Sequence, residues 1–269
     1  METPNVLGII AGSGMYPKLL AQKAREAGVR SITAAAFEGE TDPTLASLVD
    51  KIDWMRVGQL SRLLKTFRDA NVFHAIMAGQ IAPKNLFDLR PDWKALLMLA
   101  RLPRRNAESI FGAIANELAN AGVALLPATT FLEGFLAPEG LIVGSKLRRR
   151  EEADVELGLE IARETGRLDI GQTVLVKNGT ILAVEAFEGT NEAIQRGGQL
   201  GRGGAVMVKV AKPAQDMRFD VPVIGVETIR IAGATGIAVI AIEAGRTLLL
   251  EKEQIIAEAN RHGISIIGR

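Results

Sequence analysis

The sequence predicts an α/β fold in two parts: a Rossmann-like N-terminal domain built on a parallel sheet, and a distinct mixed α/β C-terminal domain. Three observations favour this fold. Short apolar runs alternate with amphipathic stretches through the first half of the chain, as in the βα repeats that form parallel sheets. The second half instead has an Asn-Gly pair between two apolar runs, which is typical of a hairpin. The length of 269 residues also exceeds that of a usual single domain.

Domain boundaries are expected where the composition changes. Residues 1–132 form the expected N-terminal domain, and residues 148–269 form the expected C-terminal domain. Between them, residues 133–147 contain four glycines and prolines, which is typical of a linker or of a crossing between domains.

Four strands separated by helices are expected in the first half. The strands are apolar runs bounded by glycine or polar residues: Val6–Ala11, Ser31–Phe37, Val72–Ala78 and Val123–Leu126. A helix is expected from Pro17 to Ala27. Two further helices are indicated by apolar residues spaced along one helix face: Leu60, Leu63, Leu64 and Phe67, then Ile110, Phe111, Ile114 and Leu118. This alternation predicts a parallel, doubly wound sheet.

The second half has a different order of elements. Leu157 and Ile161 support a helix that ends near Gly166. The hairpin joins strands at 172–176 and 181–187. Further strands and a last helix are expected at 205–210, 221–226, 235–243, 246–250 and 254–261. We interpret this half as a mixed sheet with helices.

The composition excludes several classes of protein and of site. A formal charge of +1 and an aromatic content of 4% give no basis for nucleic-acid binding. The absence of cysteine rules out disulfides and thiolate chemistry, and two histidines, His74 and His262, rule out a multi-histidine metal centre. No apolar run reaches the length of a membrane span, and no signal region is visible. We therefore expect a cytoplasmic protein.

Three polar loops of the first half follow predicted strands, at the sheet edge where open α/β sheets bind ligands. The first contains Gly12, Ser13 and Gly14, and either binds a phosphate at a helix N-terminus or makes a plain tight turn. The others offer donors for phosphate or sugar oxygens but also suit an ordinary surface loop and a helix cap. Their candidate substrate ligands are Gln80, Lys84, Asn85, Thr129 and Thr130.

The most polar stretch, KVAKPAQDMRFDVPVIG at 209–225, separates two apolar strands. Carboxylates and cations beside buried strands are costly unless they pair with each other, with a metal or with a charged ligand. A phosphate with a divalent metal fits this mixture, and a structural ion-pair cluster is the alternative. The candidate residues are Lys209, Lys212, Gln215, Asp216, Arg218 and Asp220.

A second acidic loop follows the predicted strand 181–187. Glu185 interrupts that strand, so its carboxylate is either exposed at an edge or paired, with Lys209 as a candidate partner. Glu188, Gly189 and Thr190 follow as candidate substrate ligands. This loop and the loop around Asp216 either converge on one metal or lie apart on the surface.

Five segments together resemble the LpxI-type UDP-2,3-diacylglucosamine pyrophosphatases of lipid A biosynthesis. They extend over nearly the whole chain, and the later ones are long and specific. The segments are IIAGSGMYP, AGQIAPKNLF, LLPATTFLE, DIGQTVLVKNGTILAVEAFEGTNEAI and VMVKVAKPAQDMRFDVPVIG.

The resemblance implies a hydrolase that converts UDP-2,3-diacylglucosamine to UMP and 2,3-diacylglucosamine 1-phosphate (lipid X), with its catalytic part in the C-terminal domain. It implies a divalent cation, Mg²⁺ or Mn²⁺, and a homodimer from a Gram-negative bacterium. It implies an essential aspartate in QDMRFD, so Asp216 and Asp220 are the candidate catalytic and metal-binding residues. The chemistry of a guanidinium, rather than the resemblance, makes Arg218 a candidate catalytic residue that holds phosphate oxygens. It also allows peripheral contact with the cytoplasmic face of the inner membrane.

Two other functions stay open on the sequence. A non-catalytic nucleotide- or phosphosugar-binding module built on the glycine loop would bind UMP without turnover. A dinucleotide-dependent oxidoreductase would need an acidic residue about twenty positions beyond that loop, and Glu38 and Glu40 come late for that role.

Overall fold

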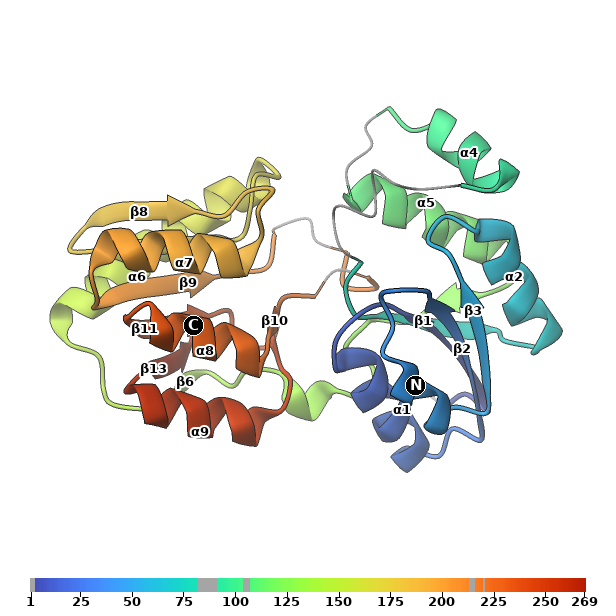
Figure 1. The fold of residues 1–269 in the computed structure, drawn as a ribbon, viewed down its shortest axis with the longest axis horizontal. Coiled ribbons are helices and arrows are strands. Elements are labelled where there is room, and N and C mark those ends of the chain that lie inside the picture. The colour runs from blue at the N-terminus through green and yellow to red at the C-terminus, as the bar shows by residue number, and fades with distance from the viewer. Residues whose placement is uncertain (1–2, 82–90, 104–106, 213–215, 220) are drawn as a thin grey trace. The chain divides into compact units, whose positions relative to one another are not determined.

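The chain forms two compact units. The computed structural model describes residues 3–81, 91–103, 107–212, 216–219 and 221–269. The first unit is Met1–Glu133 together with Asp216–Asp220, and the second is Gly134–Gln215 together with Val221–Arg269 (Figure 1). The chain therefore leaves the second unit once, for the short segment Asp216–Asp220, and then returns to it.

The first unit holds a five-stranded parallel sheet in the order β3-β2-β1-β4-β5. This order confirms the predicted Rossmann-like part. Its elements are β1 (Val6–Ala11), α1 (Tyr16–Glu26), β2 (Ser31–Phe37), η1 (Pro43–Ser47), β3 (Lys51–Met55), α2 (Leu60–Asp69), β4 (His74–Ala78), α4 (Trp93–Ala100), α5 (Ala107–Asn120) and β5 (Ala124–Leu125).

The core of the first unit lies between the sheet and its helices. The apolar face predicted for α2 is buried along its whole length, against Ile10, Ala35 and Met77 of the sheet and against residues of α4 and α5. The strand β3 was not predicted. It alternates charged and apolar residues at the edge of the sheet, so its sequence lacks the apolar run that marks β1 and β2.

The second unit holds a six-stranded mixed sheet in the order β6-β13-β11-β9-β7-β8, and a separate pair β10-β12. Helix α6 packs with the apolar residues of one sheet face, and helices α7, α8 and α9 pack with those of the other (Figure 1). The elements are η2 (Glu133–Phe135), β6 (Gly140–Val143), α6 (Arg149–Arg167), β7 (Thr173–Lys177), β8 (Thr180–Val184), α7 (Thr190–Gly201), β9 (Ala205–Lys209), β10 (Val223–Ile224), α8 (Val226–Ala234), β11 (Ile237–Ile242), β12 (Leu248–Leu249), α9 (Lys252–His262) and β13 (Ser265–Gly268).

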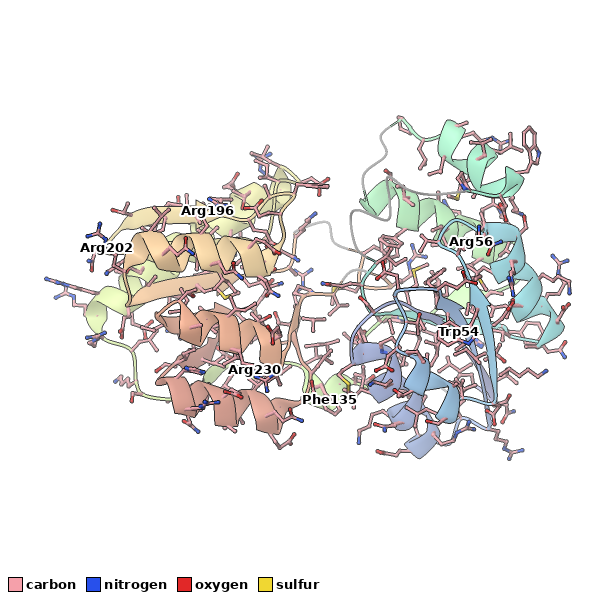
Figure 2. The ribbon with its side chains drawn as sticks, in the orientation of Figure 1. Trp54, Arg56, Phe135, Arg196, Arg202 and Arg230 are labelled. Atoms are coloured by element: carbon pink, nitrogen blue, oxygen red, sulfur yellow. The ribbon has the colours of Figure 1, made fainter. Side chains whose placement is uncertain are left out.

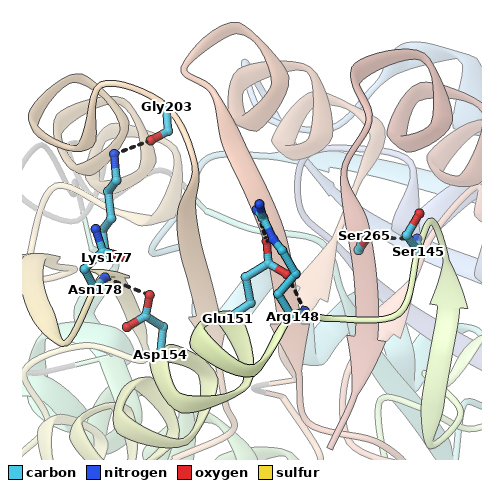
Figure 3. Close-up of polar contacts among 8 residues, drawn as sticks. All are labelled: Ser145, Arg148, Glu151, Asp154, Lys177, Asn178, Gly203 and Ser265. Atoms are coloured by element: carbon cyan, nitrogen blue, oxygen red, sulfur yellow. Dashed lines mark hydrogen bonds and ion pairs between the residues drawn. The ribbon is translucent and has the colours of Figure 1, made fainter.

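The stretch 133–147, expected as a linker, contributes a strand to this sheet. Its strand β6 pairs antiparallel with β13. Just after β6, the backbone N–H of Ser145 donates to Ser265 Oγ at 3.0 Å (Figure 3). The second sheet thus begins inside the Gly- and Pro-rich stretch.

The hairpin predicted at Asn178-Gly179 joins β7 to β8. Both residues have positive φ, 48° and 73°, as the favoured two-residue hairpin turn requires. The buried carboxylate of Asp154 on α6 accepts the N–H of Asn178 at 2.8 Å (Figure 3). It also accepts the N–H of Gly179 at 2.7 Å. Lys177 Nζ donates to the carbonyl of Gly201, the last residue of α7, and to that of Gly203 just beyond the helix. A cation is favourable at the C-terminus of a helix.

Among the residues that the structure describes, no helix has both the length and the apolar character needed to cross a membrane.

Close packing of α7 on the second sheet gives a test of the fold. An added Cβ at Gly197 would lie 2.5 Å from Leu175 Cγ and 2.6 Å from its Cβ. We expect Gly197→Ala to lower the free energy of unfolding by about 1–3 kcal/mol because the core must shift. Urea unfolding measures this. The matched control is Gly112→Ala in α5, where the space is open and alanine should add up to about 1 kcal/mol; two variants of equal stability would contradict the packing.

Candidate active site

The glycine loop after β1 is bound to the chain that follows β4. Gly12 N–H donates to Ala78 O at 2.8 Å, and Ser13 N–H donates to Gln80 O at 2.7 Å. The Ser13 hydroxyl donates to the same carbonyl at 2.9 Å. A Cβ on Gly12 would lie 2.5 Å from Gln80 O, so only glycine permits this approach. Packing against Gln80 therefore explains why residue 12 is glycine. Gly14 is exposed, has φ 87°, and stays a candidate ligand.

The segment Asp216–Phe219 is anchored on the first unit, although we expected it within the C-terminal domain. Ala128 N–H donates to Met217 O at 2.8 Å. The ring of Phe219 lies against Phe111 of α5, with 5.7 Å between ring centroids. A backbone hydrogen bond and an aromatic contact therefore hold this segment at the carboxyl end of the first sheet.

Asp216 and Arg218 form a bidentate ion pair in this segment. Arg218 Nε lies 3.0 Å from Asp216 Oδ1, and Arg218 Nη2 lies 2.6 Å from Oδ2. The Arg218 backbone N–H also donates to Oδ1 at 3.0 Å. The side-chain hydrogen bonds from Arg218 have the largest effect and, with the backbone hydrogen bond, hold the pKa of Asp216 below its usual range. Partial burial opposes them and raises the pKa. Asp216 is therefore ionised at neutral pH, and its position is fixed by Arg218.

Thr129 and Thr130 form a turn beside this segment. Thr130 N–H donates to Pro127 O, and Leu132 N–H donates to Thr129 O. The carbonyl of Ala128, the residue that binds Met217, accepts a hydrogen bond from the buried hydroxyl of Tyr16. Burial raises the pKa of Tyr16, so this hydroxyl stays protonated. The turn is thus tied to α1 as well as to the Asp216 segment.

In the second unit, a buried network joins Glu185, Thr190 and Lys209 where β8 and β9 end. Lys209 Nζ donates to Thr190 Oγ1 at 2.9 Å, and Thr190 Oγ1 donates to Glu185 Oε1 at 2.9 Å. Lys209 is 5% exposed and Glu185 is 8% exposed. Glu185 and Lys209, the candidate partners in the sequence, are linked through the hydroxyl of Thr190.

This network has unused hydrogen-bonding capacity. Glu185 Oε2 and Thr173 Oγ1 are buried and have no hydrogen-bond partner among the residues that the structure describes. Thr173 lies opposite Lys209 in the sheet register, and its carbonyl accepts from Glu185 N–H at 2.8 Å. Thr190 also begins α7, whose N-terminus carries partial positive charge. The carboxyl edge of the second sheet therefore concentrates charge and free polar atoms.

Two other predicted ligands are held in ion pairs. Glu188 pairs with Arg196 of α7 (Figure 2). The pKa of Glu188 is lowered, most of all by a hydrogen bond from its own backbone N–H group and then by the side chain of Arg196. Lys212 pairs with Asp169. Gly189 precedes α7 with φ 92°, which favours glycine there.

Four predicted site residues lie outside the described part of the chain: Lys84, Asn85, Gln215 and Asp220. Within the described part, no group of three or more Asp, Glu, His or Cys side chains is arranged to hold a metal ion.

Family models match both halves of the chain. The LpxI N-terminal domain matches residues 6–135, and the LpxI C-terminal domain matches residues 138–267. The chain belongs to the LpxI family. A relative from Caulobacter vibrioides, named UDP-2,3-diacylglucosamine pyrophosphatase LpxI, is 32% identical over 97% of this chain and 96% of its own length. The family predicted from the five segments is confirmed.

Two solved structures show a weak likeness to this LpxI-family chain. The biotin carboxylase domain of the Hydrogenobacter thermophilus 2-oxoglutarate carboxylase gives a TM-score of 0.30 at 12% identity, over 70% of this chain and 39% of that chain. The biotin carboxylase subunit of a pyruvate carboxylase gives 0.28 at 16% identity, over 69% and 38%. Likenesses this low carry no conclusion.

Two features of the site were missed in the sequence. One is the anchoring of the Asp216 segment on the first unit, for which the apolar Phe219 inside a polar loop was the available signal. The other is the buried Thr173, which lies opposite Lys209 in the pairing of β7 with β9. A polar residue within an apolar strand marks such positions, as Glu185 did.

Removal of the bridging hydroxyl tests the buried network. We expect Thr190→Val to lower the free energy of unfolding by about 1–3 kcal/mol, because a buried ammonium and carboxylate each lose a hydrogen-bond partner. Thr190→Ser keeps the hydroxyl and should retain most of the stability. Urea unfolding compares them, and a valine variant as stable as the serine variant would argue against the bridge.

Proposed function

We propose that this protein hydrolyses the diphosphate of UDP-2,3-diacylglucosamine to UMP and 2,3-diacylglucosamine 1-phosphate in lipid A biosynthesis. The observation that carries the proposal is the match of both LpxI domains, with a relative of that activity aligned over 97% of the chain. Water adds to one phosphorus, the bridging P–O bond breaks, and a proton is released. Such a reaction needs charge neutralisation on the phosphate oxygens and an oriented water.

Asp216 and Arg218 suit these two needs. A carboxylate with a lowered pKa is a poor proton acceptor, so the state of Asp216 favours holding and orienting over general-base catalysis. Arg218 uses Nε and Nη2 on Asp216, which leaves Nη1 to donate to a phosphate oxygen. Lys209 and Thr190 stay predictions as further ligands of the substrate.

A divalent cation, Mg²⁺ or Mn²⁺, suits the chemistry of Asp216. Mg²⁺ is commonly held by one or two carboxylates together with substrate phosphate oxygens and waters, and Asp216 presents an ionised, half-buried carboxylate. Asp216, with Asp220 as the second predicted ligand, would hold the ion. The ion would supply neutralisation of the diphosphate charge. Chelation by EDTA should stop turnover, and added Mg²⁺ or Mn²⁺ should restore it.

The setting that accompanies this proposal is a cytoplasmic homodimer that meets the inner-membrane face, where a diacylated substrate resides. The alternative is a non-catalytic nucleotide- or phosphosugar-binding module. It is distinguished by binding of UMP without any release of UMP from UDP-2,3-diacylglucosamine.

Neutralising Asp216 tests its role directly. We expect Asp216→Asn to lower kcat for UMP release by at least about 100-fold, since the charge that holds the cation is lost. The matched control is Asp53→Asn on β3, which breaks a comparable contact, Asp53 Oδ1 to Arg62 Nη2 at 2.6 Å. The control should keep normal turnover. Full activity of the Asp216 variant, confirmed folded by circular dichroism, would remove Asp216 from the mechanism.

The pH dependence of activity tests the ion pair. Arg218 holds the pKa of Asp216 down, so Arg218→Gln should raise it toward the ordinary value of about 4. Activity that needs ionised Asp216 is lost as pH falls through this pKa. The acid limb of kcat/KM against pH should therefore move to higher pH in the variant, but stay in place in Arg62→Gln. An unmoved limb in Arg218→Gln would show that Asp216 does not set it.

A further inference from the structure

Helix α4 of the first unit exposes an entirely apolar face. Trp93 is 72% exposed, Leu96 48% and Leu97 41%, and Ala100 is exposed as well. These residues follow the i, i+3, i+4, i+7 spacing of one helix face. Within its unit, α4 lies beside α2 and α5, away from the sheet (Figure 1). A face of this kind is normally polar when water covers it.

The opposite face of α4 is also apolar. Ala95 and Met98 are buried in the core of the first unit. With Leu63 of α2 and Phe111 of α5, they line an apolar cavity of about 70 Å³. Lys94 pairs with Glu117 of α5 at 2.8 Å, which fixes the helix on its unit. The packing of the first unit therefore uses the inner face of α4 and leaves its outer face exposed.

The charge of the surrounding sequence indicates the kind of partner. Between residues 84 and 105 the chain has six basic and two acidic residues, a net +4, whereas the whole chain has a net +1. Of these basic residues the structure describes Lys94, which is paired with Glu117, and the exposed Arg101 at the end of α4. Apolar side chains that include a tryptophan, flanked by basic residues, are typical of helices that lie in the interface of an anionic membrane.

We propose that the outer face of α4 (Trp93, Leu96, Leu97 and Ala100) inserts into the headgroup region of an anionic lipid bilayer. The inference rests on the proposed function, in that a diacylated substrate must be collected from a bilayer. An eight-residue helix is far too short to span, so the contact is peripheral. Basic residues strengthen it through the negative surface potential, and added salt weakens it.

Tryptophan fluorescence tests the insertion at a defined residue. The chain has two tryptophans. The other, Trp54, lies half-buried on β3 (Figure 2). Trp54→Phe leaves Trp93 alone. With vesicles of phosphatidylcholine and phosphatidylglycerol, Trp93 emission should move to shorter wavelength and be quenched by brominated lipid. The control Trp93→Phe, which reports Trp54, should show neither change. Absence of both changes at Trp93 would overturn the proposal.

Vesicle co-sedimentation tests the rest of the face. We expect Leu96→Ser/Leu97→Ser to reduce binding to phosphatidylglycerol-containing vesicles by at least about tenfold. The matched control, Leu168→Ser/Leu200→Ser, removes two other exposed leucines and should bind as the unaltered protein does. Equal binding of both double variants would overturn the proposal. Analytical sedimentation of Leu96→Ser/Leu97→Ser gives a second check. If the unaltered protein is a dimer, and the variant is a monomer that still binds vesicles normally, the face belongs to a second copy of the chain and the proposal is overturned.

Activity on dispersed substrate separates this inference from the proposed function. UMP release from detergent-dispersed UDP-2,3-diacylglucosamine should be unchanged in Leu96→Ser/Leu97→Ser. If that turnover is normal but vesicles are not bound, only the role of α4 fails. If the unaltered protein releases no UMP at all, the proposed function fails, whatever the vesicles show.

Discussion

Strands that run in the same direction end at the same edge of their sheet, and both units of this chain depend on that constraint. In the first unit, β1, β4 and β5 deliver the Gly12 loop, Gln80 and the Ala128 turn to one edge. In the second, the ends of β8 and β9 bring Glu185 and Lys209 together. The apolar faces of both sheets are left for the helices. Residues far apart in the sequence thus become neighbours without any local signal.

Much of the fold follows from local patterns in the sequence. The buried face of α2, with Leu60, Leu63, Leu64 and Phe67, was predicted from spacing alone, as was the turn at Asn178-Gly179. The strands β3, β6 and β13 were not. Two of them, β3 and β6, lie at sheet edges, where charged residues and glycine are tolerated and the apolar run shortens. All three are short, and their pairing depends on partners that a local pattern does not reveal.

In the candidate site, too, the sequence indicated the local contacts but not the long-range ones. The pairing of Asp216 with Arg218 is local, since two positions separate them, and the sequence suggested it as the alternative to a metal site. For Glu185, a charge within an apolar run left two alternatives open, exposure at an edge or pairing with Lys209, and the structure buries both side chains. By contrast, the bridge through Thr190 depends on where α7 begins relative to β9. The contact of Phe219 with Phe111 joins residues more than a hundred positions apart. Physical chemistry of single residues therefore locates the charges, while tertiary packing determines which of them meet.

The route of the chain through Asp216–Asp220 has a consequence for biosynthesis. The first unit obtains one of its backbone hydrogen bonds, Ala128 to Met217, and one of its aromatic contacts, Phe111 to Phe219, from residues that the ribosome adds after most of the second unit has been made. A nascent chain halted after Glu133 would have β1 to β5 in place but lack both contacts. The two units are therefore linked in the order of their completion, since the earlier one is finished only during synthesis of the later one.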